Sequence, residues 1–131
     1  MRNVRYLTDT QIAIWWEADQ QRLPERARAV LADPAHNLAF SIVVLWETVI
    51  KATRGRPDFR VDAKALRTAL CDDDMTELGI TADHVLAVGA LPPVHRDPFD
   101  RLMVAQARCD GRRFLTADRA LAGYGAWVEI A

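Results

Sequence analysis

The sequence predicts an α/β fold with a mainly parallel sheet. Short apolar runs of β-type composition alternate along the chain with longer segments of helical periodicity, and units that alternate in this way form parallel sheets. Turn signals such as Asp-Pro, Pro-Pro and Gly separate these segments. The chain has 131 residues, without repeats, low-complexity segments or a linker, so we expect a single domain over residues 1–131.

Five short runs are the expected strands. They are rich in apolar and β-branched residues, and each ends near polar or turn-forming residues. In order, they are residues 4–7, 37–40, 76–80, 113–115 and 127–130.

Helical segments fill the stretches between these runs. Ser41 and Thr81 are good N-caps, Asp97-Pro98 opens another helix, and Gly111 follows its end. The expected helices are a stretch around 12–16, one from Pro24 to the Asp33-Pro34 stop, and residues 41–53, 62–70, 81–88 and 98–108. In the helix that Ser41 begins, apolar residues recur at helical spacing: Ile42, Leu45, Trp46, Val49 and Ile50.

Composition excludes several classes of protein. Half of the residues are hydrophobic and 27% are charged, which excludes a disordered tail. The formal net charge is −1, so any contact with nucleic acid comes from local patches. The start lacks a signal-peptide core, and no apolar run approaches the roughly 18 residues of a membrane span, so we expect a cytoplasmic protein.

The cysteines and histidines do not form a zinc motif. Cys71 and Cys109 are too few for a disulfide framework, and we expect both to be reduced and buried. His36, His84 and His95 are too scattered along the chain to bind zinc as a group.

Acidic residues stand where parallel sheets form their sites, beyond the carboxyl ends of strands. Asp9 follows the first expected strand and Asp118 follows the fourth, whereas Asp97 and Asp100 begin the helix before it. Glu47 lies in the helix after the second strand. Carboxylates that share one cleft repel each other, and a divalent cation removes that conflict. An all-oxygen site favours Mg²⁺ or Mn²⁺.

Each acid also has a purely structural explanation. Asp97 before Pro98 is a good helix N-cap. Asp9 can cap the helix that starts near Thr10, and Asp118 can cap the turn that follows it. Asp100 suits the first turn of a helix because of the helix dipole. Glu47 can pair with Lys51 at the i+4 position. The placement of all these acids near strand ends nevertheless favours a site.

Four segments carry a family resemblance. They are Leu7-Thr8-Asp9-Thr10 with Trp15-Trp16, then residues 41–51, 90–107 and 114–121. The His-Arg-Asp-Pro-Phe-Asp-Arg stretch at 95–101, and Leu-Trp-Glu with its trailing Lys51, are quite specific. In this order, and over essentially the whole chain, the segments resemble the PIN-domain ribonucleases, and more closely the VapC-type toxins of toxin–antitoxin pairs. Gln11 departs from the histidine that close relatives often carry.

The resemblance implies a three-layer α/β/α sandwich with a parallel sheet of four or five strands. It also implies a Mg²⁺- or Mn²⁺-dependent endoribonuclease, in which a metal-activated water hydrolyses the phosphodiester. By position, the four site acids are Asp9, Glu47, Asp100 and Asp118, with Glu47 binding metal directly or through water. Asp97 is an extra acid, expected as a cap first and as a ligand second. Thr116 and Lys51 are expected to support the acids.

An acidic cleft needs cationic side chains to guide RNA. For any single candidate, a solvated surface charge is the more common explanation. The candidates are Lys51, Arg54, Arg56, Arg96, Arg101, Arg112 and Arg113. The adjacent Trp15 and Trp16 cannot both face one core, and an exposed tryptophan favours a partner surface. The resemblance implies a VapB-type antitoxin that blocks the acidic site, and a homodimer.

Three other functions remain open. A phosphoacceptor domain of the receiver type also carries acids at strand ends, although this chain lacks a clear strand-end lysine. A PIN-like binding module without chemistry is a second alternative, against which the four acids argue. The third is a nuclease for structured DNA, because recognition of the RNA 2′-hydroxyl leaves no local motif.

Overall fold

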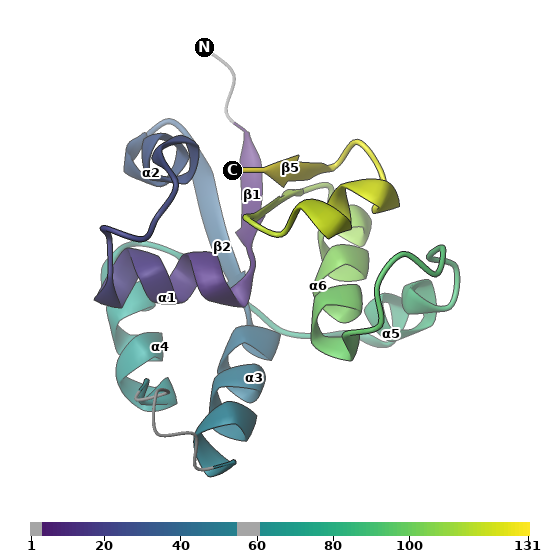
Figure 1. Ribbon diagram of the computed structural model, residues 1–131, viewed down its shortest axis with the longest axis horizontal. Helices are drawn as coiled ribbons and strands as arrows, with labels where there is room; N and C mark the ends of the chain where they lie inside the picture. The colour runs from purple at the N-terminus through teal and green to yellow at the C-terminus, as the bar shows by residue number, and fades with distance from the viewer. Residues whose placement is uncertain (1–3, 55–60) are drawn as a thin grey trace.

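The expected parallel sheet is present in the computed structural model, which describes residues 4–54 and 61–131 (Figure 1). The sheet has five strands in the order β3-β2-β1-β4-β5, and every neighbouring pair is parallel. The strands are β1 (Arg5–Thr8), β2 (Asn37–Ser41), β3 (Thr76–Leu78), β4 (Arg113–Thr116) and β5 (Val128–Ile130). All five expected strands are therefore confirmed, with boundaries shifted by one or two residues.

Helices connect each strand to the next. They are α1 (Thr10–Ala18), α2 (Glu25–Ala32), α3 (Ile42–Thr53), α4 (Ala63–Asp72), α5 (Ala82–Val88), α6 (Pro98–Cys109) and the 3₁₀ helix η1 (Arg119–Tyr124). Ser41, Thr81 and Asp97 each accept a backbone N–H of the helix that they precede, so the predicted N-caps are confirmed. Helix η1 was not among the expected helices, since only a turn was expected after Asp118.

The order of the strands reverses beside β1. The chain moves outward from β1 to β2 and β3, and then returns across the sheet to β4 and β5. Right-handed crossovers therefore place α1 to α4 on one face and α5, α6 and η1 on the other, which is the expected α/β/α arrangement. Receiver-type domains instead have the order 2-1-3-4-5. This topology therefore excludes the receiver-type alternative.

The centre of the sheet is fully buried, which fixes its register. Leu7 of β1, Phe40 of β2 and Phe114 of β4 have no exposed surface. Thr8 lies opposite both Phe40 and Leu115, so the three central strands end nearly level. The N–H of Asp9 donates to the carbonyl of Leu115 at 3.0 Å, which extends this pairing by one residue. As a result, side chains that follow β1 and β4 share one edge of the sheet.

Helix α3 buries a different face from the one that its apolar stripe suggests. Its buried residues are Val43, Val44, Glu47 and Thr48. Ile42, Trp46 and Val49 of the predicted stripe are 41%, 50% and 45% exposed. Because both faces carry apolar side chains, periodicity predicts the helix correctly but does not identify its inward face.

Two further expectations about burial are wrong. Cys71 and Cys109 are both exposed. Cys71 follows the buried Leu70 on α4 and is turned about 100° away from it, and Cys109 lies beyond the last buried turn of α6. Trp15 and Trp16 are both half-buried and pack against the core, so neither is the exposed tryptophan that was expected. None of the helices in the described ranges is long and apolar enough to cross a bilayer.

Candidate metal centre

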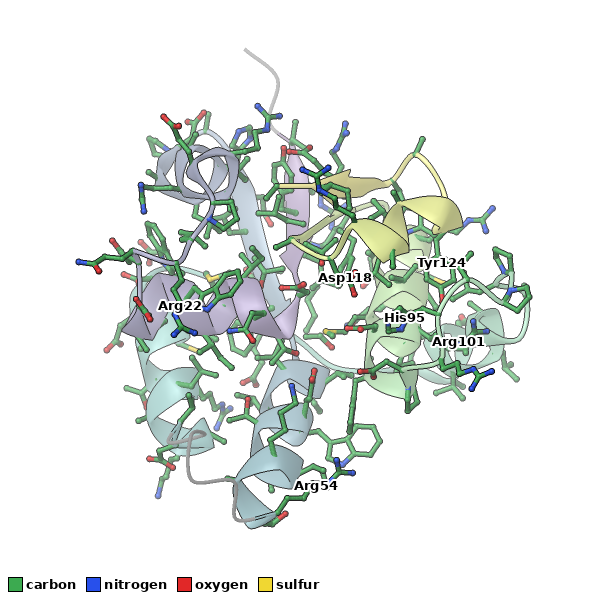
Figure 2. All side chains as sticks on the ribbon, viewed as in Figure 1. Arg22, Arg54, His95, Arg101, Asp118 and Tyr124 are labelled. Carbon is green, nitrogen blue, oxygen red and sulfur yellow. The ribbon has the colours of Figure 1, made fainter. Side chains whose placement is uncertain are left out.

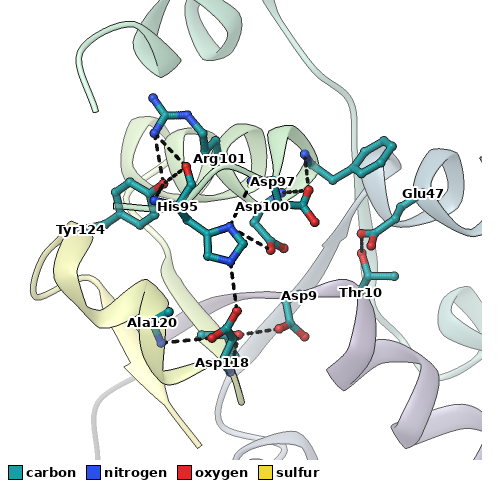
Figure 3. Close-up of polar contacts among 12 residues, drawn as sticks. Asp9, Thr10, Glu47, His95, Asp97, Asp100, Arg101, Asp118, Ala120 and Tyr124 are labelled. Atoms are coloured by element: carbon teal, nitrogen blue, oxygen red, sulfur yellow. Dashed lines mark hydrogen bonds and ion pairs between the residues drawn. The ribbon is translucent and has the colours of Figure 1, made fainter. Parts of the chain in front are cut away.

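All five predicted acids lie around one cavity at the carboxyl edge of the sheet. Asp9 follows β1 and Asp118 follows β4, where the strand order reverses. Asp97 and Asp100 come from the start of α6, and Glu47 comes from α3 (Figure 3). The cavity has a volume of about 170 Å³, and its other lining residues are Thr10, Gln11 and Lys51. The fold thus brings together side chains that are up to 109 positions apart in the sequence, from Asp9 to Asp118.

Asp9 is held by two hydrogen bonds and is buried. Its Oδ1 accepts the backbone N–H of Ile12 at 2.7 Å, which caps α1, and its Oδ2 accepts the hydroxyl of Thr116. Burial, with a smaller contribution from the negative charges of Glu47 and Asp118, raises the pKa of Asp9 to about 6, although the two hydrogen bonds lower it. Asp9 is therefore both a helix cap and a carboxylate that is costly to ionise.

Thr116 connects Asp9 with Asp118. Its hydroxyl donates to Asp9 and accepts the backbone N–H of Asp118 at 3.1 Å. Asp118 uses its Oδ1 to accept the N–H of Ala120 at 3.0 Å, which begins η1. Thr116 therefore lies next to both strand-end acids, as its predicted supporting role requires.

The two acids of α6 have different surroundings. Asp97 is the helix cap: its Oδ1 accepts the N–H groups of Phe99 at 2.8 Å and of Asp100 at 3.3 Å. Asp100 lies one turn further along, facing the cavity. Burial and, to a smaller extent, repulsion by neighbouring carboxylates together raise the pKa of Asp100 to about 7; these carboxylates are Asp97, Asp9, Glu47 and Asp118.

Glu47 is buried but not alone. Its Oε1 accepts the hydroxyl of Thr10 at 2.6 Å, and its Oε2 lies 2.8 Å from the Nζ of Lys51. Lys51 is at the i+4 position on the same helix, so the structural explanation of Glu47 is also correct. Glu47 therefore forms the ion pair with Lys51 and also lines the cavity.

These side chains fit a hard divalent cation. The cavity gathers carboxylate oxygens, and the shifts of Asp9 and Asp100 show that ionising them together is unfavourable in the protein alone. A bound cation would reverse that cost. All-oxygen ligands favour Mg²⁺ or Mn²⁺ over softer metals.

Comparison with known proteins identifies the family. A model of the PIN domain matches residues 6–126. The chain belongs to the PIN-domain family. This PIN domain is 32% identical to the ribonuclease VapC22 of Mycobacterium tuberculosis (strain ATCC 25618 / H37Rv) over 116 residues, which cover 88% of each chain.

Three solved toxin–antitoxin structures share the fold of this PIN domain. VapBC2 from Rickettsia felis, bound to a DNA fragment from its promoter, is 12% identical with a TM-score of 0.67, over 98% of both chains. A toxin–antitoxin complex from Klebsiella pneumoniae is 21% identical with a TM-score of 0.60, over 95% of this chain and 99% of the other. DNA-bound VapBC from Salmonella typhimurium is 14% identical with a TM-score of 0.63, over 98% of this chain and 97% of the other.

His95 is a site residue that sequence reasoning missed. It was named from the sequence only as one of three scattered histidines and as part of the specific 95–101 stretch, without a role at the site, yet the PIN domain places it between two of the acids. Its Nδ1 is 3.9 Å from Asp100 Oδ2, and its Nε2 is 3.5 Å from Asp118 Oδ2 (Figure 3). The available signal was its position in the specific 95–101 stretch, directly before Asp97 and Asp100.

The basic candidates are spread over the PIN domain. Arg96 is exposed beside the acids of α6, and Arg54 is exposed at the far end of α3 from Asp118 (Figure 2). Arg112 and Arg113 are at the opposite end of β4 from Asp118, where Arg112 donates to Tyr6 and Asn37. Arg56 lies outside the described residues.

Arg101 is engaged with the protein itself. Its guanidinium donates to the carbonyls of Val88 at 3.2 Å and Pro92 at 3.1 Å, and to the hydroxyl of Tyr124 at 3.2 Å. It therefore fastens the loop between α5 and α6. This use of its N–H groups leaves fewer of them for a phosphate.

Proposed function

We propose that this protein is a metal-dependent endoribonuclease of the VapC type. The observation that carries the proposal is the cavity at the β1–β4 edge, where carboxylates from β1, α3, α6 and β4 meet and where ionisation of Asp9 and Asp100 is disfavoured. The similarity to the ribonuclease VapC22 supports the choice of RNA.

Asp9, Asp100 and Asp118 would hold the Mg²⁺ or Mn²⁺, with Glu47 contributing directly or through water. A divalent cation in that place supplies positive charge beside the phosphoryl group and makes a bound water more acidic. Thr116 and the Ile12 N–H orient Asp9, and Lys51 and Thr10 do the same for Glu47. Asp97 remains a helix cap first and a ligand second.

RNA needs cations around this negative cavity. We propose Arg96, and Arg54 at greater distance, as exposed guides for the phosphate backbone, with Arg56 as a sequence-based candidate. Binding should then weaken steeply as salt is added, because phosphate contacts release counterions. For Arg101 the bonds to the α5–α6 loop support a structural role alongside any contact with RNA.

The proposed partners are a VapB-type antitoxin and a second copy of the chain. An antitoxin would neutralise the enzyme by covering the acidic cavity, where an arginine could pair with the carboxylates. The toxin–antitoxin structures that share the fold support this partner. The exposed apolar face of α3 supports the homodimer.

The first experiment compares cleavage of mixed RNAs by antitoxin-free protein with Mg²⁺, with Mn²⁺ and with chelator, beside Asp9→Asn. Asparagine keeps an oxygen for the Ile12 N–H, so the fold should persist while cleavage is lost. Asp62→Asn is the matched control, because Asp62 caps α4 by accepting the Ala65 N–H and does not line the cavity.

The outcomes separate the candidate functions. Cleavage that requires metal and Asp9 supports the nuclease, and parallel DNA substrates test its choice of nucleic acid. Cleavage by Asp9→Asn would refute the assignment of the site. Metal binding without cleavage indicates a narrow target. If the protein neither binds metal nor cleaves RNA, the catalytically silent binding module is favoured.

A further inference from the structure

A histidine ring lies inside the acidic cluster. Figure 3 shows His95 between Asp118 and Asp100, with its Nε2 toward the first and its Nδ1 toward the second. Since His95, Asp100 and Asp118 can each offer an atom within 4.8 Å of the others, the ring could be either a metal ligand or a hydrogen-bond donor.

The hydrogen bond at Nδ1 separates these two roles. The backbone N–H of Asp97 donates to His95 Nδ1 at 3.1 Å, so Nδ1 must carry a lone pair and the neutral ring has its proton on Nε2. A histidine that binds metal through one nitrogen normally donates a proton from the other. Here the other nitrogen accepts. The arrangement therefore favours a donor at Nε2 that faces Asp118.

The loop that carries His95 is fixed by its own contacts. The N–H of His95 donates to the hydroxyl of Tyr124 at 3.1 Å. The Arg101 guanidinium donates to that same hydroxyl and to the carbonyl of His95, at 3.4 Å (Figure 3). It also donates to the carbonyl of Pro92. Tyr124 is buried, so this contact ties the loop to the core. The direction of the imidazole is thus set before any ligand arrives.

Asp118 is the acid that most needs such a donor. Its side chain is 44% exposed, and only its Oδ1 serves as the cap of η1. Its Oδ2 lies 3.5 Å from His95 Nε2, so a shift of about 0.5 Å would bring the pair to an ordinary N–H···O distance.

We propose that His95 is a positioning residue of the metal centre, which donates from Nε2 to Asp118 and orients that carboxylate toward the cation. His95 acts through Asp118 and is not itself a ligand. This inference rests on the proposed function, because it assigns Asp118 to the metal. It adds a residue that is not one of the acids. In this arrangement the Asp97 N–H fixes the tautomer of His95, and His95 orients Asp118.

Nitrogen-15 spectra of the histidine side chains test the tautomer directly. We expect His95 to be protonated at Nε2 and to stay so when Mg²⁺ is added. A neutral ring with its proton on Nδ1 would overturn the proposal, because Nε2 would then have no proton to donate to Asp118. Loss of the Nε2 proton on Mg²⁺ addition would also overturn it, because that would indicate that Nε2 binds the metal.

Calorimetric titration with Mn²⁺ alone tests the positioning role. His95→Ala should bind Mn²⁺ about tenfold more weakly, as is usual for partners of metal ligands. His95→Gln should recover part of that loss, because its amide can place a donor near Nε2. His36→Ala is the control: His36 is another half-buried histidine, paired with Asp33, and should leave Mn²⁺ affinity unchanged. Thermal unfolding verifies that each variant folds.

The results distinguish this inference from the proposed function. If the wild-type protein binds no Mn²⁺, both fail. If the wild-type protein binds Mn²⁺ and folded His95→Ala binds it equally well, only the role of His95 fails. A His95→Gln protein no better than His95→Ala would also contradict the donor role.

Discussion

Thr116 links two acids through a single hydroxyl group, which makes it the most informative uncharged residue of the cavity. Thr116→Val keeps the shape of the side chain but removes the donor to Asp9 and the acceptor for the Asp118 N–H. Because both acids lose orientation, we expect Mn²⁺ affinity to fall about tenfold. Calorimetric titration measures this change.

Thr8→Val is the matched control for that variant. The Thr8 hydroxyl is buried at the end of β1 and has no hydrogen-bond partner among the described residues. Its removal should leave Mn²⁺ affinity unchanged and should not lower the free energy of unfolding. Equal losses of affinity in the two variants would mean that Thr116 acts only through packing.

Raised pKa values also predict how metal binding depends on pH. With the pKa of Asp9 at about 6 and that of Asp100 at about 7, the folded metal-free protein holds protons that metal must displace. We expect Mg²⁺ or Mn²⁺ binding to release protons between about pH 5 and 7, and little above pH 8. Calorimetry in buffers of different ionisation enthalpy counts these protons. Proton release that is independent of pH would contradict the shifts.

The same shifts predict the stability of the metal-free protein. A carboxyl group whose folded pKa exceeds its unfolded value binds more protons in the folded state, so its contribution to stability declines as pH rises from about 4 to about 7. We expect Asp100→Asn to remove part of that decline, as measured by thermal unfolding with chelator present. An unchanged pH dependence in Asp100→Asn would refute the prediction.

At the scale of elements, helix α3 contributes to the cavity through an ion pair within the helix. Lys51→Met removes the cation beside the buried Glu47 and leaves Thr10 as its remaining partner. We expect a loss of about 1–3 kcal/mol in the free energy of unfolding without metal. The loss should be smaller with Mn²⁺ bound, because the ion replaces the missing charge. Urea denaturation measures both.

Arg67→Met provides the comparison for Lys51→Met. Arg67 on α4 pairs with Glu77 of β3 through two contacts of 2.6 and 3.0 Å, but the arginine is exposed. Exposed ion pairs contribute little, so its loss should be clearly smaller and insensitive to Mn²⁺. If Arg67→Met lowers the free energy of unfolding as much as Lys51→Met does, the burial of Glu47 does not explain the contribution of the Lys51–Glu47 pair.

At the scale of the whole molecule, the outward face of α3 predicts association. An apolar hollow of about 250 Å³ there is lined by Ile42, Val43, Trp46, Ile80 and Leu102. If the proposed homodimer uses this face, Trp46→Glu should yield a folded monomer, because Trp46 is already half-exposed in the isolated chain. Analytical ultracentrifugation of both proteins measures this.

Trp46 also touches the element that carries two acids. Its ring packs edge-on against that of Phe99, with the ring centroids 4.7 Å apart, and Phe99 lies directly before Asp100 on α6.

Trp46→Ala serves as the control for Trp46→Glu, since it shortens the side chain without adding a charge. A Trp46→Glu protein that remains a dimer would place the interface elsewhere.

Local chemistry explains which features could be predicted from the sequence. Ser41, Thr81 and Asp97 cap helices through their own neighbouring backbone N–H groups, so a few residues suffice to predict them. The strand-end acids follow from the same logic, because parallel strands direct their carboxyl ends to one edge. The sequence by itself thus determined the fold class, the sheet and the acids that would meet.

Contacts between distant segments decided the rest. The side of α3 that is buried depends on which neighbours cover it, and its two apolar faces gave no preference. Arg101 donates to a carbonyl at the start of the α5–α6 connection. The backbone N–H of Asp97 and the hydroxyl of Tyr124 from η1 hold His95 so that its ring faces Asp118. These positions depend on tertiary packing because the energies of charge and hydrogen bonding depend on what lies within a few ångström, which residue spacing alone does not specify.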